Sequence, residues 1–390
     1  MKKQHYLFIN VLFVGLMLFS AAIVVQFMTG YRPLDAIAGV WNKKEQHVQT
    51  EECSSHAALE KLSEISEPTV KKLAVYQQAC HSFAADTLML FFSMAKDQDE
   101  ARQYAVEDAK VLKAFASVKI RPLIMIEPSD REGTLLDFQL FANGSYDTVT
   151  QAYFTQLKAE GITDAQLGII NPFPEANLPY WKNNKIEFFS PAVNNYLMTA
   201  RASFPQVQTS VLLNSATYEL TDFNWENGDY NSLIPYVKDI KPTLINYAGI
   251  QGFPWIARQG GSATIFNAAE FLNPSLLQEM ADRLGTKKVW FNTGTFSTKY
   301  TLDPKLMRTI TPSQRKEILM TITGQALELK EKGYDVAVNL FAEDKSESSE
   351  ETNWSYWKGD DPFASQDTAV LTSFIKGLNT NEIHFWLFDK

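Results

Sequence analysis

Residues 312–342 read PSQRKEILMTITGQALELKEKGYDVAVNLFA. Residues 312–333 form an amphipathic helical pattern that ends in Lys-Gly, and residues 335–342 form a short apolar run. A helix that leads into a continuously apolar strand is typical of a parallel sheet covered by helices on both faces. This stretch therefore indicates the α/β class.

The same unit recurs along the chain. Apolar runs of strand length stand at 87–93, 120–127, 166–171, 207–214, 243–249, 288–293, 335–342 and 383–388, with helical patterns between them. Eight strands and seven intervening helices favour a (β/α)8 TIM barrel over an open doubly wound sheet. No glycine-rich phosphate loop follows any run, which argues against a nucleotide-binding sheet. We predict a TIM barrel over residues 81–390.

Composition excludes several classes of function. The formal net charge is −9 and no stripe of Lys or Arg stands out, so nucleic acid is not an expected partner. The five His and two Cys residues show no metal-ligand spacing. We therefore expect neither a metal site nor a cofactor.

The N-terminal segment predicts a membrane anchor. Lys2 and Lys3 precede residues 7–28, which are nearly uncharged and long enough to cross a hydrocarbon core of about 30 Å. The apolar stretch continues past Ser-Ala-Ala at 20–22, which favours an uncleaved signal anchor over a cleaved signal peptide. Residues 1–30 are thus predicted to hold a cytoplasmic N-terminus and a single transmembrane signal anchor. The positive charges at the N-terminus predict that the barrel is periplasmic or extracellular.

Residues 31–80 are predicted to join the anchor to the barrel through a polar linker and a helix between Ser54 and Gln78. Cys53 and Cys80 flank this helix. In an oxidising compartment they can form a disulfide, and two free buried thiols are the alternative. The oligomeric state is left open by the sequence.

The residues that follow the apolar runs are the candidates for function, because a TIM barrel carries its chemistry at the carboxyl ends of its strands. Acids, amides and aromatic residues are concentrated there, as a carbohydrate site requires, so a polysaccharide or oligosaccharide is the expected partner. The candidate catalytic residues are Glu127, Glu175 and Glu343. The candidate substrate-binding residues are Asn171, Asn177, Tyr180, Trp181, Asn214, Tyr247, Trp255, Asn292, Trp354 and Trp357. Aromatic residues packed under long loops, and a solvated Glu343 at the start of an acidic run, are the alternatives.

Part of the sequence resembles glycoside hydrolase family 26, the β-mannanase-type barrels of clan A. The motifs that carry the resemblance, in the family's order and spacing, are IEP at 126–128, GSYD at 144–147, PFPEAN at 172–177 and PYW at 179–181. The resemblance to this family is clear over some 60 residues and vague over another 170. Asn171 and Pro174 depart from it, since the family has Arg and His there.

The resemblance implies that Glu175 is the general acid/base. A retaining glycosidase needs a second carboxylate about 5–5.5 Å away, which the family carries three strands further on. Three runs on, this chain has Asn292 or Thr293, and neither is a carboxylate. Glu127 or Glu343 would have to supply the second carboxylate instead. If Glu343 lies across the barrel from Glu175, the wider spacing would favour an inverting enzyme.

Two strand numberings are compatible with the resemblance. In a circularly permuted barrel, the run at 383–388 takes the place of the family's first strand. In the direct numbering, Glu175 follows strand three and Glu343 follows strand seven.

The sequence thus predicts a membrane-anchored, extracytoplasmic glycoside hydrolase-like protein that cleaves a polysaccharide by carboxylate acid/base catalysis. Glu175 would protonate the leaving oxygen. The alternative is a catalytically degenerate barrel that binds glycan, for example in exopolysaccharide or envelope handling, because Asn292 stands where a nucleophile is expected.

Overall fold

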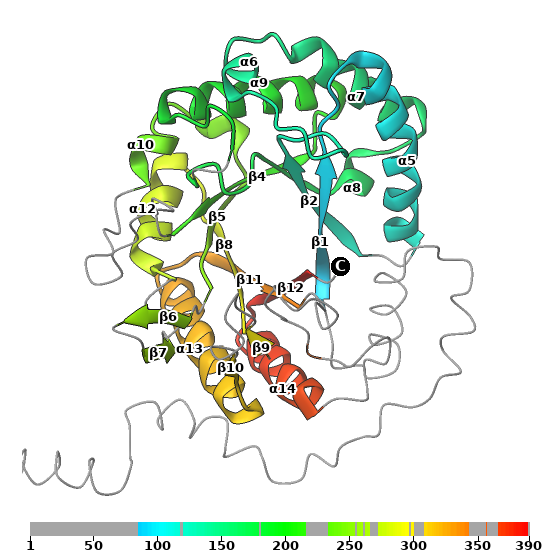
Figure 1. The fold of residues 1–390 in the computed structure, drawn as a ribbon. Helices are drawn as coiled ribbons and strands as arrows, with labels where there is room; N and C mark the ends of the chain where they lie inside the picture. The colour runs from blue at the N-terminus through cyan, green and yellow to red at the C-terminus, as the bar shows by residue number, and fades with distance from the viewer. Residues whose placement is uncertain are drawn as a thin grey trace, which may run out of the picture. The chain divides into compact units, whose positions relative to one another are not determined.

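A computed structural model of the chain divides into two compact units, Met1–Glu52 and Cys53–Lys390 (Figure 1). The structure describes residues 85–117, 120–178, 181–215, 233–253, 256–259, 262–265, 272–295, 298–299, 308–342, 356 and 366–388. In these residues no helix is both long and apolar enough to span a membrane. The predicted anchor, linker and N-terminal helix, and both cysteines, lie outside the described residues.

Eight parallel strands close into a barrel (Figure 1). In order around the barrel they are β1 (Ala85–Ser93), β2 (Arg121–Glu127), β3 (Ile169–Pro172), β4 (Gln208–Asn214), β5 (Tyr247–Gln251), β8 (Lys288–Gly294), β11 (Asp335–Phe341) and β12 (His384–Phe388). The last strand pairs with the first. Each strand overlaps one of the predicted apolar runs, so the predicted TIM barrel is confirmed. Whether it is permuted relative to family 26 stays a prediction.

Two strands begin later than the sequence pattern indicates. Residues 164–167 form the short helix α8 (Asp164–Leu167), because Thr163 and Gln166 cap it reciprocally. Before β5, the chain makes the 3-10 turn η2 (Pro242–Leu244). The fifth strand therefore starts at Tyr247 instead of at residue 243, which changes where Tyr247 lies.

Helices surround the barrel (Figure 1). They are α5 (Gln98–Ser117), α6 (Phe138–Ala142), α7 (Asp147–Ala159), α8, α9 (Ile186–Ser203), α10 (Ile234–Val237), α12 (Pro274–Leu284), α13 (Pro312–Glu331) and α14 (Gln366–Thr380). Two antiparallel pairs lie in the connections: β6 (Ile256–Gln259) with β7 (Ser262–Ile265), and β9 (Thr298–Lys299) with β10 (Arg308–Thr309).

The barrel interior has its own apolar cluster, separate from the larger core between the strands and the helices. Trp290 is its largest member: it is fully buried, and its Nε1 donates to Ser210 Oγ at 2.8 Å. The ring lies against Gly249, where a Cβ would come within 2.4 Å of two indole atoms. Side chains two residues apart on a strand face the same side. The inward face of β8 therefore continues from Trp290 to Asn292, and the interior changes from apolar to polar toward the carboxyl ends.

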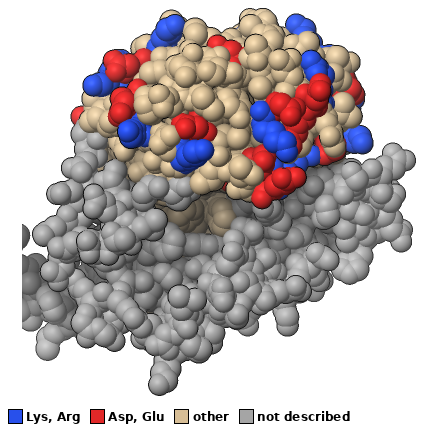
Figure 2. Space-filling view, turned by 45° about the horizontal axis from the view of Figure 1, so that its top comes forward, with Lys and Arg blue, Asp and Glu red and all other residues tan. Residues whose placement is uncertain are grey.

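The surface shown in Figure 2 carries Lys and Arg interspersed with Asp and Glu. Among the described residues, charges of opposite sign form ion pairs, such as Lys332–Glu328 at 2.7 Å and Lys287–Asp282 at 2.9 Å. This mixed pattern is typical of a solvated protein surface.

Candidate active site

The turn that follows β3 presents Glu175. Phe173 and Glu175 have positive φ angles of 55° and 56°, a region that costs a non-glycine residue on the order of 1–3 kcal/mol. Phe173, Pro174 and Ala176 are buried, whereas Glu175 is partly exposed. Strained residues persist where the surrounding structure fixes them, and they are concentrated at functional sites.

Side chains beyond the turn hold it in this conformation. Trp181 is buried, and its Nε1 donates to the carbonyl oxygen of Pro174 at 2.9 Å. Asn184 Nδ2 donates to the carbonyl oxygen of Ala176 at 3.0 Å. Trp181 thus buttresses the turn that carries Glu175, in keeping with the alternative that its ring packs under a loop.

Asn177 ties the same turn to the end of β4. Its Nδ2 donates to the carbonyl oxygen of Asn214, and its Oδ1 accepts from the backbone N–H of Asn214, both at 2.8 Å. Both residues are buried. The amide of Asn177 therefore has a structural task at the predicted site.

A chain of amide side chains leads from the barrel interior to Glu175. Asn339, Asn292 and Gln251 occupy paired register positions on β11, β8 and β5. Asn339 Nδ2 donates to Asn292 Oδ1 at 2.6 Å, and Asn292 Nδ2 donates to Gln251 Oε1 at 2.5 Å. Gln251 Nε2 then donates to Glu175 Oε1. These three residues, called the amide relay below, are each 6% exposed or less.

Asn292 occupies the position where the family resemblance places a nucleophile. In the structure its side chain accepts from Asn339 and donates to Gln251. At this position β8 therefore supplies an amide link to Glu175 instead of a second carboxylate.

Glu127 ends β2, the strand that pairs with β3. It is partly exposed. The backbone links the ends of the two strands, because Phe173 N–H donates to the carbonyl oxygen of Ile126 at 2.9 Å. Of the three predicted catalytic residues, Glu127 and Glu175 thus follow neighbouring strands.

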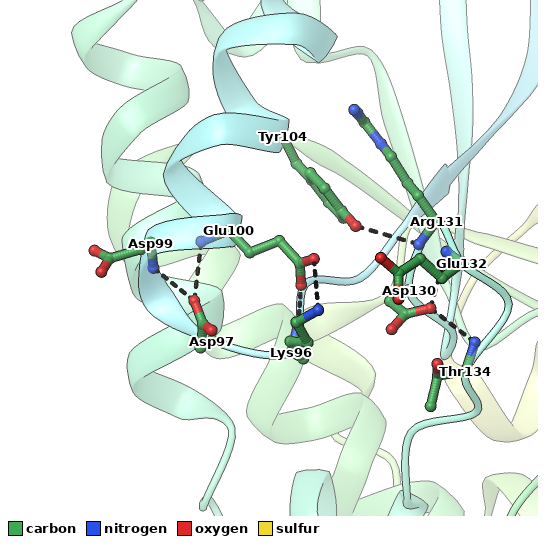
Figure 3. Close-up of polar contacts among 9 residues, drawn as sticks. All are labelled: Lys96, Asp97, Asp99, Glu100, Tyr104, Asp130, Arg131, Glu132 and Thr134. Atoms are coloured by element: carbon green, nitrogen blue, oxygen red, sulfur yellow. Dashed lines mark hydrogen bonds and ion pairs between the residues drawn. The ribbon is translucent and has the colours of Figure 1, made fainter.

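The loop after β2 is ordered by its own polar contacts (Figure 3). Asp130 Oδ1 accepts from the backbone N–H groups of Glu132 at 3.0 Å and Thr134 at 2.7 Å. The backbone N–H of Arg131 donates to Tyr104 Oη of α5 at 3.2 Å. These bonds fix the rim of the barrel directly beyond Glu127.

A buried carboxylate lies behind this rim. Asp108 of α5 accepts hydrogen bonds from Tyr153 Oη and from Arg131 Nη2, both at 2.8 Å. Burial raises the pKa of Asp108 to about 6, although the hydrogen bond from Tyr153 and the charge of Arg131 act in the opposite direction. Asp108 joins α5, α7 and the rim loop.

Asn171 is the most enclosed of the predicted substrate-binding residues. It is 0% exposed, and neither polar atom of its side chain has a hydrogen-bond partner among the described residues. It lies two residues after Ile169, a member of the interior cluster, so it faces the barrel interior.

The prediction that Tyr247 lies at the carboxyl rim is wrong. Tyr247 begins β5 and therefore lies at the amino end of the barrel. Arg121 Nη1 donates to its hydroxyl at 3.4 Å, and Lys288 Nζ lies 5.2 Å from its ring centre. It lines a cavity of about 340 Å³ at that end, with Arg121, Lys288, Asp335, Ala337, His384 and Trp386.

The remaining predicted site residues are Glu343, Tyr180, Trp255, Trp354 and Trp357, and they lie outside the described residues. In the described part of the chain, no three His, Cys, Asp or Glu side chains come together as a metal site requires.

Two members of the amide relay were not selected from the sequence as site residues. Gln251 follows the fifth apolar run and was considered with the other residues at the strand ends, but it was not included among the substrate-binding residues; Asn339 lies inside the run DVAVNLF. The available signal was a single amide within a run that is otherwise apolar. An isolated amide at an interior strand position indicates a polar partner across the sheet.

Comparison with solved structures supports the same architecture. The β-glycosidase BGL167 matches with a TM-score of 0.50 and 12% identity, over 83% of this chain and 87% of that chain. The chain thus shares the TIM-barrel fold of this β-glycosidase. A family 1 β-glucosidase from Thermotoga maritima in complex with isofagomine lactam has a TM-score of 0.48 and 12% identity, over 84% and 90% of the two chains. Virulence factor SghA from Agrobacterium tumefaciens has a TM-score of 0.46 and 10% identity, over 79% of this chain and 85% of that chain.

No protein-family model matches the chain, and no curated protein matches it in sequence. At 10–12% identity the structural likeness establishes the fold alone, because one fold hosts many functions. Membership of family 26 stays a prediction.

Proposed function

We propose that the chain is a glycoside hydrolase-like protein in which Glu175 donates the proton to the leaving oxygen. The observation that carries this proposal is the placement of Glu175: a partly exposed carboxylate in a strained, otherwise buried turn at the carboxyl end of a barrel strand. That end is where TIM-barrel enzymes carry their chemistry. The neighbouring Phe173 is buried and packs its ring against Phe138, Phe141 and Tyr196, which anchors the turn in the core beneath the helices.

The second carboxylate of the proposed reaction is Glu127 or Glu343. Glu127 ends the strand next to β3, and a spacing of about 5–5.5 Å from Glu175 would suit a retaining nucleophile. Glu343 follows β11 in the sequence, and a spacing of about 6.5–9.5 Å would suit an inverting base. The stereochemistry of the product therefore distinguishes the two.

The substrate we propose is a polysaccharide or oligosaccharide outside the cytoplasm. The polar side chains toward the carboxyl end of the barrel interior, such as Asn171 and Gln251, are consistent with a polar substrate at that end. The proposed anchor at residues 7–28 would hold the barrel beside the membrane from which a cell's own polysaccharide emerges. Membrane attachment and location are part of this proposal.

A second candidate function is glycan binding without cleavage. It is favoured by Asn292, because an amide occupies the position at which the resemblance calls for a carboxylate and is already bonded on both sides. A binding protein keeps its polar and aromatic contacts without needing a second acid.

Release of reducing sugar from a panel of β-glycans and envelope polysaccharides tests the proposal on the full chain in detergent. Glu175→Gln removes the transferable proton with little change of shape, so we expect release to fall by about 10²–10⁴-fold. Glu132→Gln, an exposed carboxylate in the neighbouring rim loop, is the matched control and should keep the activity. Glycan binding without release, unchanged in Glu175→Gln, would instead establish the second candidate.

A further inference from the structure

We propose that Gln251, Asn292 and Asn339 are positioning residues that reserve one oxygen of Glu175 for proton transfer. In this proposal, which rests on the proposed role of Glu175, the relay keeps Oε1 as a hydrogen-bond acceptor. Oε2 is then the oxygen that carries the transferable proton. No residue of the relay needs to touch the substrate.

The direction of the relay follows from its hydrogen bonds. The carbonyl oxygen of Gln251 accepts from Asn292, so the amino group of Gln251 faces Glu175. Rotating the Gln251 amide would place two oxygens against each other at Glu175 and two amino groups against each other at Asn292. Because Asn339 fixes the orientation of Asn292 in the same way, the donor at Glu175 is set from within the barrel.

Asn339, at the inner end of the relay, lowers the stability of the fold, because it buries a polar atom that packing of the barrel does not require. Asn339 is 0% exposed, and its Oδ1 has no hydrogen-bond partner among the described residues. It stands between Ala337 and Phe341 on the inward face of β11, and both pack in the interior cluster. A leucine of similar size would fill this position without burying an unpaired carbonyl. The amide is consistent with a task at the other end of the relay.

The chemical effect of the relay is to stabilise the charge that forms when Glu175 gives up its proton. As the glycosidic C–O bond breaks, the proton on Oε2 passes to the leaving oxygen and Glu175 becomes a carboxylate. A hydrogen bond to Oε1 strengthens as that charge develops, because the acceptor becomes an anion. Successive hydrogen bonds in a low-dielectric interior polarise one another, so Asn339 and Asn292 increase the strength of the Gln251 donor.

The test is the titration of the Glu175 carboxyl group, followed by 13C NMR of the full chain with labelled glutamate side chains. The Glu175 signal is assigned by its loss in Glu175→Gln. We expect the titration midpoint to rise by about one pH unit in Asn292→Leu and by less in Asn339→Leu, because the ionised form loses an oriented donor. Gln251→Met removes the donor directly and should give the largest rise. This variant also keeps the test available if a leucine in the interior prevents folding.

Thr293→Val is the matched control. Thr293 lies on the same strand as Asn292, is equally enclosed, and has a hydroxyl without a partner among the described residues. Its side chain points to the opposite face of β8. We expect no change of the Glu175 titration midpoint in this variant. A similar shift in all four variants would show that any change in the barrel interior perturbs Glu175, and the proposed role of the relay would be rejected.

The proposed function and the relay fail in distinguishable ways. If no glycan is cleaved but the midpoint moves in the three relay variants alone, hydrolysis is rejected; the relay then orients a donor toward Glu175, but its role in proton transfer to a glycoside is rejected with hydrolysis. If a glycan is cleaved and the midpoint is unchanged in all three relay variants, the relay is rejected and hydrolysis stands. If both are correct, the limb of the pH–rate profile that reports Glu175 moves with the measured midpoint.

Discussion

At the scale of single residues, two carboxylates of this barrel are held in opposite ways. Glu175 is partly exposed and receives an oriented donor from Gln251, whereas Asp108 is enclosed between α5, α7 and the rim loop. Enclosure disfavours the charged form, and it outweighs both the Tyr153 hydrogen bond and the Arg131 charge at Asp108. Asp108 is therefore a group through which the stability of the fold depends on pH.

The pKa of Asp108 lies at about 6 in the folded chain, above its ordinary value of 3.8. A raised pKa means that the folded state binds the proton more tightly than the unfolded state does. The contribution to stability is fully present below about pH 4 and is lost as the pH rises through about 6, with a size on the order of 3 kcal/mol. We expect Asp108→Asn to flatten this part of the pH dependence of the free energy of unfolding, measured by urea denaturation between pH 4 and 7.

The control for this experiment is Glu107→Gln. Glu107 also pairs with Arg131, but it is exposed, and that pairing lowers its pKa. Its contribution to stability has the opposite sign and is screened by solvent. If Glu107→Gln removed the slope and Asp108→Asn retained it, the assignment of the pH dependence to Asp108 would be rejected.

At the scale of elements, close packing inside the barrel depends on Gly249 of β5. A methyl group there would come within 2.4 Å of Trp290, which cannot move freely because Ser210 accepts a hydrogen bond from its indole. We expect Gly249→Ala to lower the free energy of unfolding by about 1–3 kcal/mol. The same substitution at Gly324 of α13, which has open space around it, should raise it by about 0.5–1 kcal/mol. Equal effects at the two sites would contradict the overpacking explanation.

The elements could be predicted from the sequence where burial alone determines them. A strand covered on both faces must be apolar throughout, and each of the eight runs overlaps a strand. The starts of β3 and β5 were predicted too early, because local hydrogen bonds at these positions form a short helix and a 3-10 turn in residues that the apolar pattern assigned to the strands. Thr163 and Gln166 cap a short helix, and Pro242 opens a 3-10 turn. The second of these differences moved Tyr247 to the opposite end of the barrel.

The candidate site was predictable only in part. Glu175 was selected as a candidate because its motif is contiguous in sequence, whereas the positive φ angles of its turn are a feature of the structure alone. The bond from the amide relay to Glu175 spans 76 positions, and the two bonds within the relay join residues that are 41 and 47 positions apart. They meet because the register of β5, β8 and β11 aligns them. Register in a closed barrel follows from the tilt and stagger of all strands together, so no single run of sequence contains it.

At the scale of the whole molecule, the proposed function depends on where the barrel works. We expect the full chain to fractionate with membranes, to resist extraction by high salt and to be released by detergent, because residues 7–28 can span a hydrocarbon core. Because Lys2 and Lys3 are expected to keep the N-terminus in the cytoplasm, the barrel should lie outside the membrane. Protease added to the outside of spheroplasts should therefore digest it. A chain lacking residues 1–30, expressed without an export signal, is the control, and it should leave the membrane fraction and become protected from that protease. A full-length chain that is free in the cytosol would reject the anchor and, with it, the proposal that the substrate is an extracytoplasmic polysaccharide.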